Sequence, residues 1–240
     1  MVDSEIKYCI RVSMKAKHVH LKMTVENGLE IVVPRGFDRC RIPRLLDEKR
    51  RWIQKAREKI AEHRQHFEPG QREGLPDLLI LTALNETWRI DYRATASRRV
   101  SLLGADGLLI IAGRIENLPL CREVLRRWLK RRFGETIVNW LNAMGKQMKF
   151  SFGKVAVKSQ KTRWASCSQD RAISLNHKLL FLPEHLVRYV LLHELCHTVI
   201  LNHSTRFWSL VRRLEPRYRE LDRELRDAWS YVPPWLEQGG

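Results

Sequence analysis

The chain has 240 residues, of which 44 are Lys or Arg and 27 are Asp or Glu, so its formal net charge is +17 at pH 7. A hydrophobic fraction of 44% supplies a globular core and excludes an intrinsically disordered chain. No apolar run approaches the roughly 20 residues that a membrane helix needs. The acidic first residues, Met1 to Glu5, also lack the apolar core of a signal peptide. We therefore expect a cytoplasmic protein that does not act at a membrane.

The cysteines agree with that compartment. The chain has five of them, an odd and scattered set without a C-x-x-C motif, at Cys9, Cys40, Cys121, Cys167 and Cys196. A disulfide framework is typical of smaller secreted chains with a denser, even set of cysteines. We expect reduced thiols, most of them buried as small hydrophobic side chains.

The positive charge is spread over all three thirds of the chain, so no basic tail carries it. A uniformly basic surface attracts polyanions, which makes DNA or RNA a candidate partner. One predicted helix concentrates six cations beside an apolar stripe: Arg122, Arg126, Arg127, Lys130, Arg131 and Arg132. These side chains either contact phosphates or cover the solvated face of a helix that packs on the core.

Two stretches predict a β-hairpin followed by a basic helix. Asn27-Gly28 and Asp106-Gly107 each lie between apolar runs, which favours type I′ turns because both turn residues need positive φ. The helices are predicted over about residues 45–63 and 121–133, and each contains Arg-Arg-Trp followed by an aliphatic residue. We interpret the two stretches as a weak tandem repeat with a linker at residues 67–71, although coincidence also explains the similarity.

The last third of the chain predicts two strands and a helix. Val155 and Val157 indicate a strand, residues 164–170 a polar turn, and residues 172–175 the returning strand. Pro183 suits the first position of a helix, where its missing N–H would have no partner, and the helix is predicted to run to about Leu201.

The predicted elements belong to the α+β class. We expect two domains, a β-hairpin with a basic helix over residues 1–75 and an α+β domain over residues 76–240, or one compact unit containing both.

The predicted helix contains an H-E-x-x-H motif, His193-Glu194-Leu195-Cys196-His197. Histidines four residues apart lie on one helical face, so both imidazoles can bind one zinc ion. Glu194 stands beside the first ligand, where it can take a proton from a water whose pKa Zn²⁺ lowers towards 7. The motif therefore predicts a zinc cofactor and a catalytic base at Glu194. The alternative is a buried helix with two hydrogen-bonded histidines.

A third candidate ligand, His203, follows His197 by six residues, the spacing of the metzincin pattern H-E-x-x-H-x-x-G-x-x-H. Ile200 replaces the glycine of that pattern, so we do not expect a true metzincin. We expect the helix to end at Asn202 in a left-handed conformation, with His203 in the loop and Ser204 capping the next helix. The alternative third ligands are three downstream carboxylates: Glu215, Glu220 and Glu224.

Four segments together resemble the YgjP-like zinc metallopeptidases, relatives of the SprT group: residues 163–168, 173–176, 193–197 and 202–208. The resemblance is strongest over residues 155–220 and looser in the amino-terminal strands and around Trp52. The family usually has glycine where this chain has Ala165. The resemblance implies a zincin-like metallopeptidase domain, with zinc bound by His193, His197 and His203 and with Glu194 as the catalytic base.

The segment that begins at Arg163 has two interpretations. In zincins a strand beside the active-site helix pairs with the extended substrate, and Arg163 or a backbone N–H is a candidate to stabilise the oxyanion. The alternative is a structural hairpin with Trp164 in the core. Cys167 is not expected as a ligand, because a catalytic zinc keeps its fourth position open. Further candidates near the site are His177, Tyr189 and Tyr218.

Two functions compete at this point. The first is a zinc-dependent metallopeptidase that hydrolyses a peptide or protein substrate. The second is a basic nucleic-acid-binding module with a structural or degenerate zinc site, or a protease associated with nucleic acid. Glu194 discriminates between them, because a structural zinc site has no use for an acid–base carboxylate and usually closes its fourth position. We therefore favour the peptidase.

Overall fold

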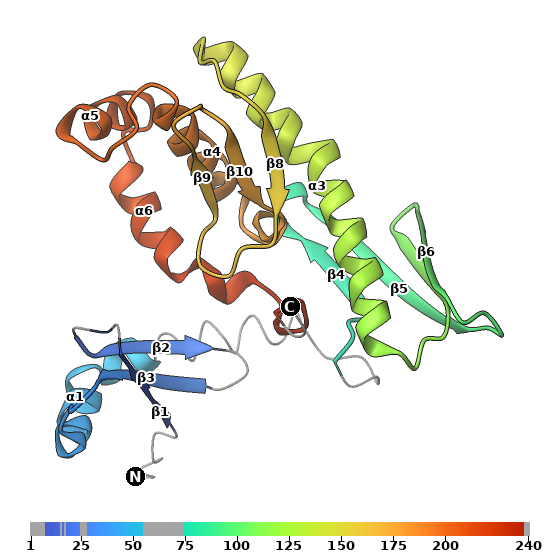
Figure 1. The fold of residues 1–240 in the computed structure, drawn as a ribbon, viewed down its shortest axis with the longest axis horizontal. Helices are drawn as coiled ribbons and strands as arrows, with labels where there is room; N and C mark the ends of the chain where they lie inside the picture. The colour runs from blue at the N-terminus through green and yellow to red at the C-terminus, as the bar shows by residue number, and fades with distance from the viewer. Residues whose placement is uncertain (1–7, 15, 17, 25–27, 55–73, 238–240) are drawn as a thin grey trace. The chain divides into compact units, whose positions relative to one another are not determined.

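The computed structural model describes residues 8–14, 16, 18–24, 28–54 and 74–237. The chain divides into two compact units, residues 1–68 and 69–240, each considered by itself below (Figure 1). Helices and mixed sheets make up both, which confirms the α+β class. Within the described ranges, no helix combines the length and apolarity that crossing a membrane requires.

The first unit contains the first predicted hairpin. Its sheet has the order β1-β3-β2, from β1 (Tyr8–Ser13), β2 (His20–Thr24) and β3 (Gly28–Pro34). Strands β2 and β3 are antiparallel, and β1 joins β3 in parallel. Three of the four buried β3 residues, Leu29, Ile31 and Val33, share one core with residues of the following helix.

The first basic helix begins earlier than predicted. After a short 3₁₀ turn, η1 (Arg39–Arg41), α1 spans Ile42–Glu48 and the chain is helical again over residues 50–54. Pro43 stands in the first turn of α1, where its missing N–H costs nothing. The rest of the predicted helix and the predicted linker at 67–71 lie outside the described residues.

The second unit opens with a four-stranded sheet of order β4-β5-β7-β6. Its strands are β4 (Leu78–Leu81), β5 (Glu86–Ala94), β6 (Val100–Ala105) and β7 (Leu108–Gly113), with the 3₁₀ turn η2 (Thr82–Leu84) after β4. The predicted second hairpin is confirmed: β6 and β7 are antiparallel, and Asp106 and Gly107 have φ of 48° and 77°. Both signs are those that a type I′ turn needs.

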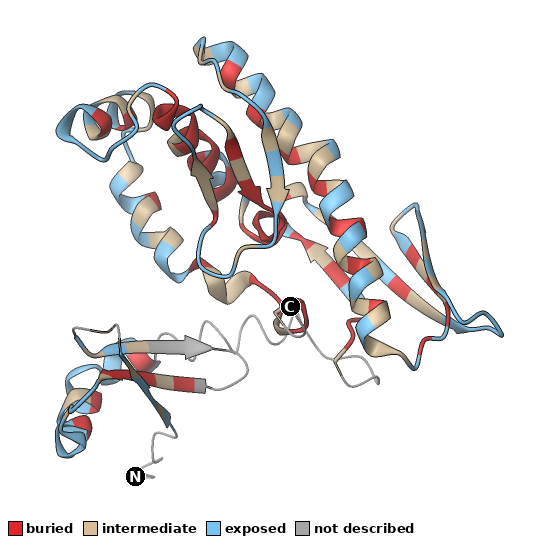
Figure 2. Cartoon of the chain, in the orientation of Figure 1, coloured by how far each residue is buried: buried red, intermediate tan, exposed pale blue. Residues whose placement is uncertain are grey.

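The helix predicted over residues 121–133 is much longer. It is α3 (Leu118–Met148), which ends where Lys149 adopts a left-handed φ of 58°. Gly134 lowers helix propensity locally, but a buried stripe continues past it through Ile137 and Leu141. Figure 2 shows this stripe along one side of α3. Packing of the stripe therefore outweighs the cost of the glycine.

The third sheet places a strand beside the candidate site. It has the order β8-β10-β9, from β8 (Val155–Lys158), β9 (Ala165–Cys167) and β10 (Ile173–Asn176). Strands are confirmed at 155 and at 172–175, but the prediction that the second returns along the first is wrong, because β10 is parallel to β8. The antiparallel partner of β10 is the edge strand β9, which forms part of the predicted polar turn. The turn itself closes over residues 168–172, where Arg171 has a φ of 61°.

The remaining helices are α4 (Glu184–His197), α5 (Thr205–Leu214) and α6 (Tyr218–Asp227), with the 3₁₀ segments η3 (His177–Phe181), η4 (Ala228–Tyr231) and η5 (Pro234–Leu236). Helix α4 packs against β9, α5 and α6 (Figure 1). It is buried along most of its length, including Leu186, Val187 and Leu195. This burial gives the H-E-x-x-H motif a rigid support.

The predicted ends of α4 are corrected. Pro183 precedes the helix as its N-cap residue, and the helix ends at His197 with Thr198 as C-cap. The β-branched residues after His197 are poor helix formers, and the Thr198 hydroxyl donates to the Leu195 carbonyl instead. Asn202 is not among the described residues with positive φ. The prediction that the helix continues to a left-handed Asn202 is therefore wrong.

The prediction that most cysteines are buried is also wrong. Cys121 and Cys196 are buried, Cys167 is half-buried, and Cys9 and Cys40 are exposed in the small first unit. A thin three-stranded sheet leaves one face of its edge strand in solvent, which explains the exposure of Cys9 on β1.

Candidate active site

Three imidazole rings meet at the end of α4. His193 and His197 lie one helical turn apart, and their Nε2 atoms are 3.2 Å from each other. His203 lies in the loop between α4 and α5, as predicted, with its Nε2 3.0 Å from that of His193 and 3.1 Å from that of His197. Among the described residues, this is the cluster whose donor atoms can hold a metal ion.

The donor set fits a zinc ion. Tetrahedral coordination with Zn–N bonds of about 2.0–2.1 Å places two ligand nitrogens about 3.3 Å apart. The three Nε2 atoms form a triangle with edges of 3.0–3.2 Å, close to that separation. Imidazole nitrogens also suit Zn²⁺ chemically, and three of them leave a fourth position open.

The protonation states of the cluster favour a metal. Burial and, to a smaller extent, the neighbouring His197 and His203 together lower the pKa of His193 to about 3. Burial also lowers the pKa of His197. Imidazoles that are neutral at physiological pH keep the lone pair that a metal needs.

The turn after α4 sets the tautomer of His197. Its Nδ1 lies 3.1 Å from the carbonyl oxygen of Ile200, which only accepts hydrogen bonds. Nδ1–H therefore donates to Ile200, and Nε2 faces the cluster with its lone pair. The early end of α4 leaves this carbonyl free for the contact, whereas in a helix that continued to residue 204 it would accept from that residue's backbone N–H.

Aromatic side chains of α5 and α6 enclose the cluster. Phe207 stacks on His197 with ring centroids 4.3 Å apart, and Trp208 stacks on His203 at 5.5 Å. Tyr218 stacks on Trp208 in turn, so it lies behind Trp208 rather than against a histidine. Ser204 is the N-cap residue of α5 as predicted, but its side chain makes no cap hydrogen bond.

Glu194 is a buried carboxyl beside these rings. It is 6% exposed, and its Oε2 has no hydrogen-bond partner. Burial raises the pKa of Glu194 to about 7. Across from it on β9, burial and the charge of Glu194 raise the pKa of the Cys167 thiol to about 11. A buried carboxyl without a partner is costly to the fold and is typical of a functional site.

The other sequence-predicted candidates lie elsewhere or in secondary positions. Glu224 faces His185 at 3.0 Å, and Glu220 pairs with Arg217 at 3.1 Å. Glu215 accepts a hydrogen bond from the backbone N–H of Arg217. The structure therefore shows other partners for all three alternative ligands.

Of the other candidates outside the H-E-x-x-H motif, Tyr189 lies beside the cluster, whereas Trp164 lies in the core and Arg163 at the surface. The ring of Tyr189 is edge-on to His193 at 6.2 Å, and burial and the nearby Asp222 raise the pKa of its hydroxyl. Trp164 is buried and stacks on Trp229, as the structural interpretation of that segment predicts. The side chain of Arg163 is exposed.

The cationic face of α3 gives no support to a nucleic-acid partner. All five of its arginine side chains have partners within this chain. Arg127 pairs with Glu123 at 2.8 Å, Arg131 with Glu135 at 3.7 Å, and Arg132 with Glu86. Two others donate to backbone carbonyls, Arg122 to Gly74 and Arg126 to Leu236.

Comparison with known proteins identifies the family. The model of the YgjP-like, metallopeptidase domain family matches residues 17–228, so the chain belongs to this family, as the resemblance predicted. At the level of the family it is therefore a metallopeptidase.

Two solved structures are similar over a shorter region. The first is the crystal structure of the metallopeptidase zymogen of Pyrococcus abyssi abylysin. The match has 26% sequence identity and a TM-score of 0.34, and it covers 38% of this chain and 91% of the abylysin chain. The metallopeptidase zymogen of Methanocaldococcus jannaschii jannalysin is 24% identical, with coverages of 37% and 92% and a TM-score of 0.34. A search of curated proteins gives no match.

Proposed function

We propose that the protein is a zinc-dependent peptidase that hydrolyses peptide bonds in peptide or protein substrates. His193, His197 and His203 are the zinc ligands, and Glu194 is the general base. The observation that carries the proposal is the triangle of three Nε2 atoms, 3.0–3.2 Å apart, with a buried and unpartnered carboxyl on the adjacent residue. The free thiols add support for the reducing cytoplasm as its location.

Each residue has a defined task in this reaction. Zinc, when bound, polarises the scissile carbonyl and lowers the pKa of the attacking water. The Glu194 carboxylate takes a proton from that water and passes it to the leaving amine nitrogen, so one residue serves as base and then as acid. Phe207 and Trp208 hold the imidazole rings and exclude water from their flanks.

The substrate lies along β9 in this proposal. Within the described sheet, β9 is an edge strand paired with β10 on one side only. It packs against α4, and its Cys167 lies close enough to Glu194 that the charge of that carboxylate raises the pKa of the thiol. An extended peptide that adds to the free edge of β9 would place its backbone beside Glu194.

The test separates the base from the ligands. Glu194→Gln is expected to bind one zinc per chain but to lose hydrolysis of fluorescein-labelled casein by about a hundredfold or more, because an amide cannot accept the proton. His203→Ala is expected to lose both zinc and activity. Zinc content is measured by elemental analysis after dialysis.

Glu184→Gln is the matched control. Glu184 lies on the same helix but is exposed and pairs with Arg188 at 2.6 Å, so this variant should behave as wild type. Equal turnover by Glu194→Gln and wild type would remove Glu194 from the mechanism. If zinc-loaded wild type hydrolyses no protein substrate, the site is structural and the proposal is wrong.

A further inference from the structure

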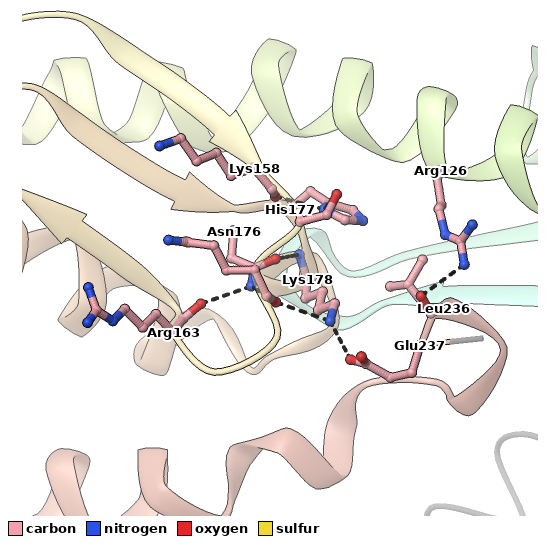
Figure 3. Close-up of polar contacts among 10 residues, drawn as sticks. Arg126, Lys158, Arg163, Asn176, His177, Lys178, Leu236 and Glu237 are labelled. Atoms are coloured by element: carbon pink, nitrogen blue, oxygen red, sulfur yellow. Dashed lines mark hydrogen bonds and ion pairs between the residues drawn. The ribbon is translucent and has the colours of Figure 1, made fainter. Parts of the chain in front are cut away.

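Three consecutive polar residues at the junction of β10 and η3 are buried and take no part in the proposed chemistry. Asn176, His177 and Lys178 are 0%, 1% and 3% exposed. Figure 3 shows them turned towards the loop between β8 and β9, which spans residues 159–164. Burying a lysine, a histidine and an asparagine in sequence is costly unless each finds partners, so the partners identify what the group holds.

Asn176 binds both halves of this loop. Its Nδ2 donates to the carbonyl oxygens of Gln160, at 2.8 Å, and of Arg163, at 2.9 Å. Its backbone N–H donates to the carbonyl of Trp164 at 2.9 Å. The Asn176 Oδ1 accepts from the backbone N–H of Lys178, so both ends of the amide are used.

His177 and Lys178 bind the first half. The Nδ1–H of His177 donates to the carbonyl of Lys158 at 3.0 Å. The Lys178 ammonium donates to the carbonyl of Gln160 at 3.2 Å and forms an ion pair with Glu237, which follows η5. Together with Asn176, these residues bind backbone carbonyls at four positions: Lys158, Gln160, Arg163 and Trp164.

The carboxy-terminal segment closes the arrangement. The Lys178 ammonium lies 5.2 Å from the ring of Trp229, and Trp229 stacks on Trp164 at 4.0 Å with an interplanar angle of 17°. Trp164 directly precedes β9. The ion pair with Glu237 compensates the charge that Lys178 brings into the interior.

Stability alone does not account for such a group. A buried ion pair is often replaceable by apolar side chains without loss of stability, so its contribution lies in fixing one arrangement of the backbone. What it fixes here is the chain that leads into β9, the edge strand that packs against α4. In Figure 3 the guanidinium of Arg163 points away from the group while its carbonyl is held.

We infer that Asn176, His177, Lys178 and Glu237 are positioning residues for peptide binding. They hold the β8–β9 loop so that the free edge of β9 is preorganised to pair with an extended peptide beside Glu194. The inference rests on the proposed peptidase function. It adds that the carboxy-terminal segment, through Glu237, sets substrate affinity without touching substrate or metal.

The test uses two single variants of the full chain. Glu237→Gln removes the carboxylate charge from a half-exposed position and leaves the buried Lys178 ammonium without its counter-ion. Lys178→Met removes the ammonium and keeps the apolar stem. For fluorescein-labelled casein, each is expected to raise KM about three- to tenfold, the equivalent of one lost hydrogen bond, with kcat within about twofold of wild type. Zinc stoichiometry should not change.

Hydrogen exchange supplies a readout that does not depend on activity. In both variants the amides of residues 161–167 should exchange faster than in wild type, whereas those of α4 should not. Glu123→Gln is the matched control, because Glu123 also pairs with a cation but lies on the exposed face of α3. The double variant Lys178→Met/Glu237→Gln leaves neither charge unpaired and should exchange more slowly than Lys178→Met alone.

The two proposals fail in different ways. If wild type hydrolyses casein while Glu237→Gln and Lys178→Met match Glu123→Gln in KM and in exchange, the positioning role is overturned and the peptidase stands. A fall in kcat or in zinc content with unchanged KM would also overturn it. If zinc-loaded wild type hydrolyses nothing, the peptidase and the peptide-binding role both fall.

Discussion

His177 illustrates how burial sets the charge of a side chain away from the metal cluster. Its Nδ1–H donates to the Lys158 carbonyl, and its Nε2 is buried without a partner. Burial lowers its pKa to about 4, and the nearby cations Lys130, Lys178 and Arg126 act in the same direction. The folded protein therefore holds this imidazole neutral at pH values where the unfolded chain protonates it.

A pH dependence of stability follows. An unfolded histidine titrates near 6.5, so between about pH 6.5 and pH 4 the unfolded state binds more protons at His177 than the folded state. The free energy of unfolding should fall as the pH drops through this window. His177→Asn keeps a donor near the Lys158 carbonyl but does not titrate, so its slope against pH should be shallower. Urea unfolding at several pH values measures both slopes.

His185→Asn is the control for that measurement, because His185 is exposed on the same unit. Its slope should change less than that of His177→Asn. A His177→Asn slope equal to that of wild type would contradict the neutral, buried state of His177.

Whether a contact between two residues could be predicted depends on how far apart they lie in the sequence. Spacing along one helix was enough to predict that His193 and His197 lie side by side, because i and i+4 share a helical face. The partners of Asn176 are 13 and 16 residues away, and Lys178 and Glu237 are separated by 59. Such pairs depend on how the loops close, which no local pattern contains, so the sequence did not indicate the group around Asn176.

At the scale of elements, two glycines of α3 make a matched pair. A Cβ built on Gly134 meets nothing within 4 Å, whereas one on Gly145 lies 2.6 Å from the Phe152 ring and 3.4 Å from the Phe150 carbonyl. Gly134→Ala is expected to raise the free energy of unfolding by about 0.5–1 kcal/mol, through helix propensity and a less flexible unfolded chain.

Gly145→Ala should act in the opposite direction. The added methyl must displace Phe152, an overpacking cost of about 1–3 kcal/mol. Denaturant unfolding of both variants measures the difference, and helicity by circular dichroism verifies that α3 is intact. A stabilised Gly145→Ala would show that Phe152 does not pack closely against α3.

The two errors in the predicted helix ends have different causes. The sequence predicted the second hairpin, where local turn chemistry decides, and two of the three strands of the third sheet, β8 and β10. It ended α3 too early and α4 too late. In α3, Gly134 is overruled by a buried stripe that continues to Leu141, and in α4 the Thr198 side chain takes up the Leu195 carbonyl. Tertiary packing outweighed propensity in α3, whereas in α4 the β-branched residues after His197 and the Thr198 hydrogen bond both favour the early end.

For the whole molecule, the sequence predicted the fold class and the family, but it did not determine the role of the cationic face of α3. The α+β class followed from the alternation of predicted strands and helices, and the family from four short motifs. The net charge of +17 gave two interpretations of α3 that the sequence did not separate. Ion pairs such as Arg127–Glu123 and Arg131–Glu135 favour the solvated face.

The salt dependence of polyanion binding tests that interpretation. A chain of this charge attracts DNA without specificity, and each phosphate it neutralises releases counterions, so affinity falls steeply as salt rises. If the attraction belongs to the whole surface, duplex DNA should bind weakly and lose binding near physiological salt. Arg127→Glu/Arg131→Glu should then give the same salt slope as Arg212→Glu/Arg223→Glu, which reverses two exposed cations on α5 and α6. Fluorescence anisotropy from about 20 to 200 mM salt measures these slopes. Saturable binding at physiological salt that only the α3 variant loses would instead identify α3 as a nucleic-acid interface, without altering the metal cluster on α4.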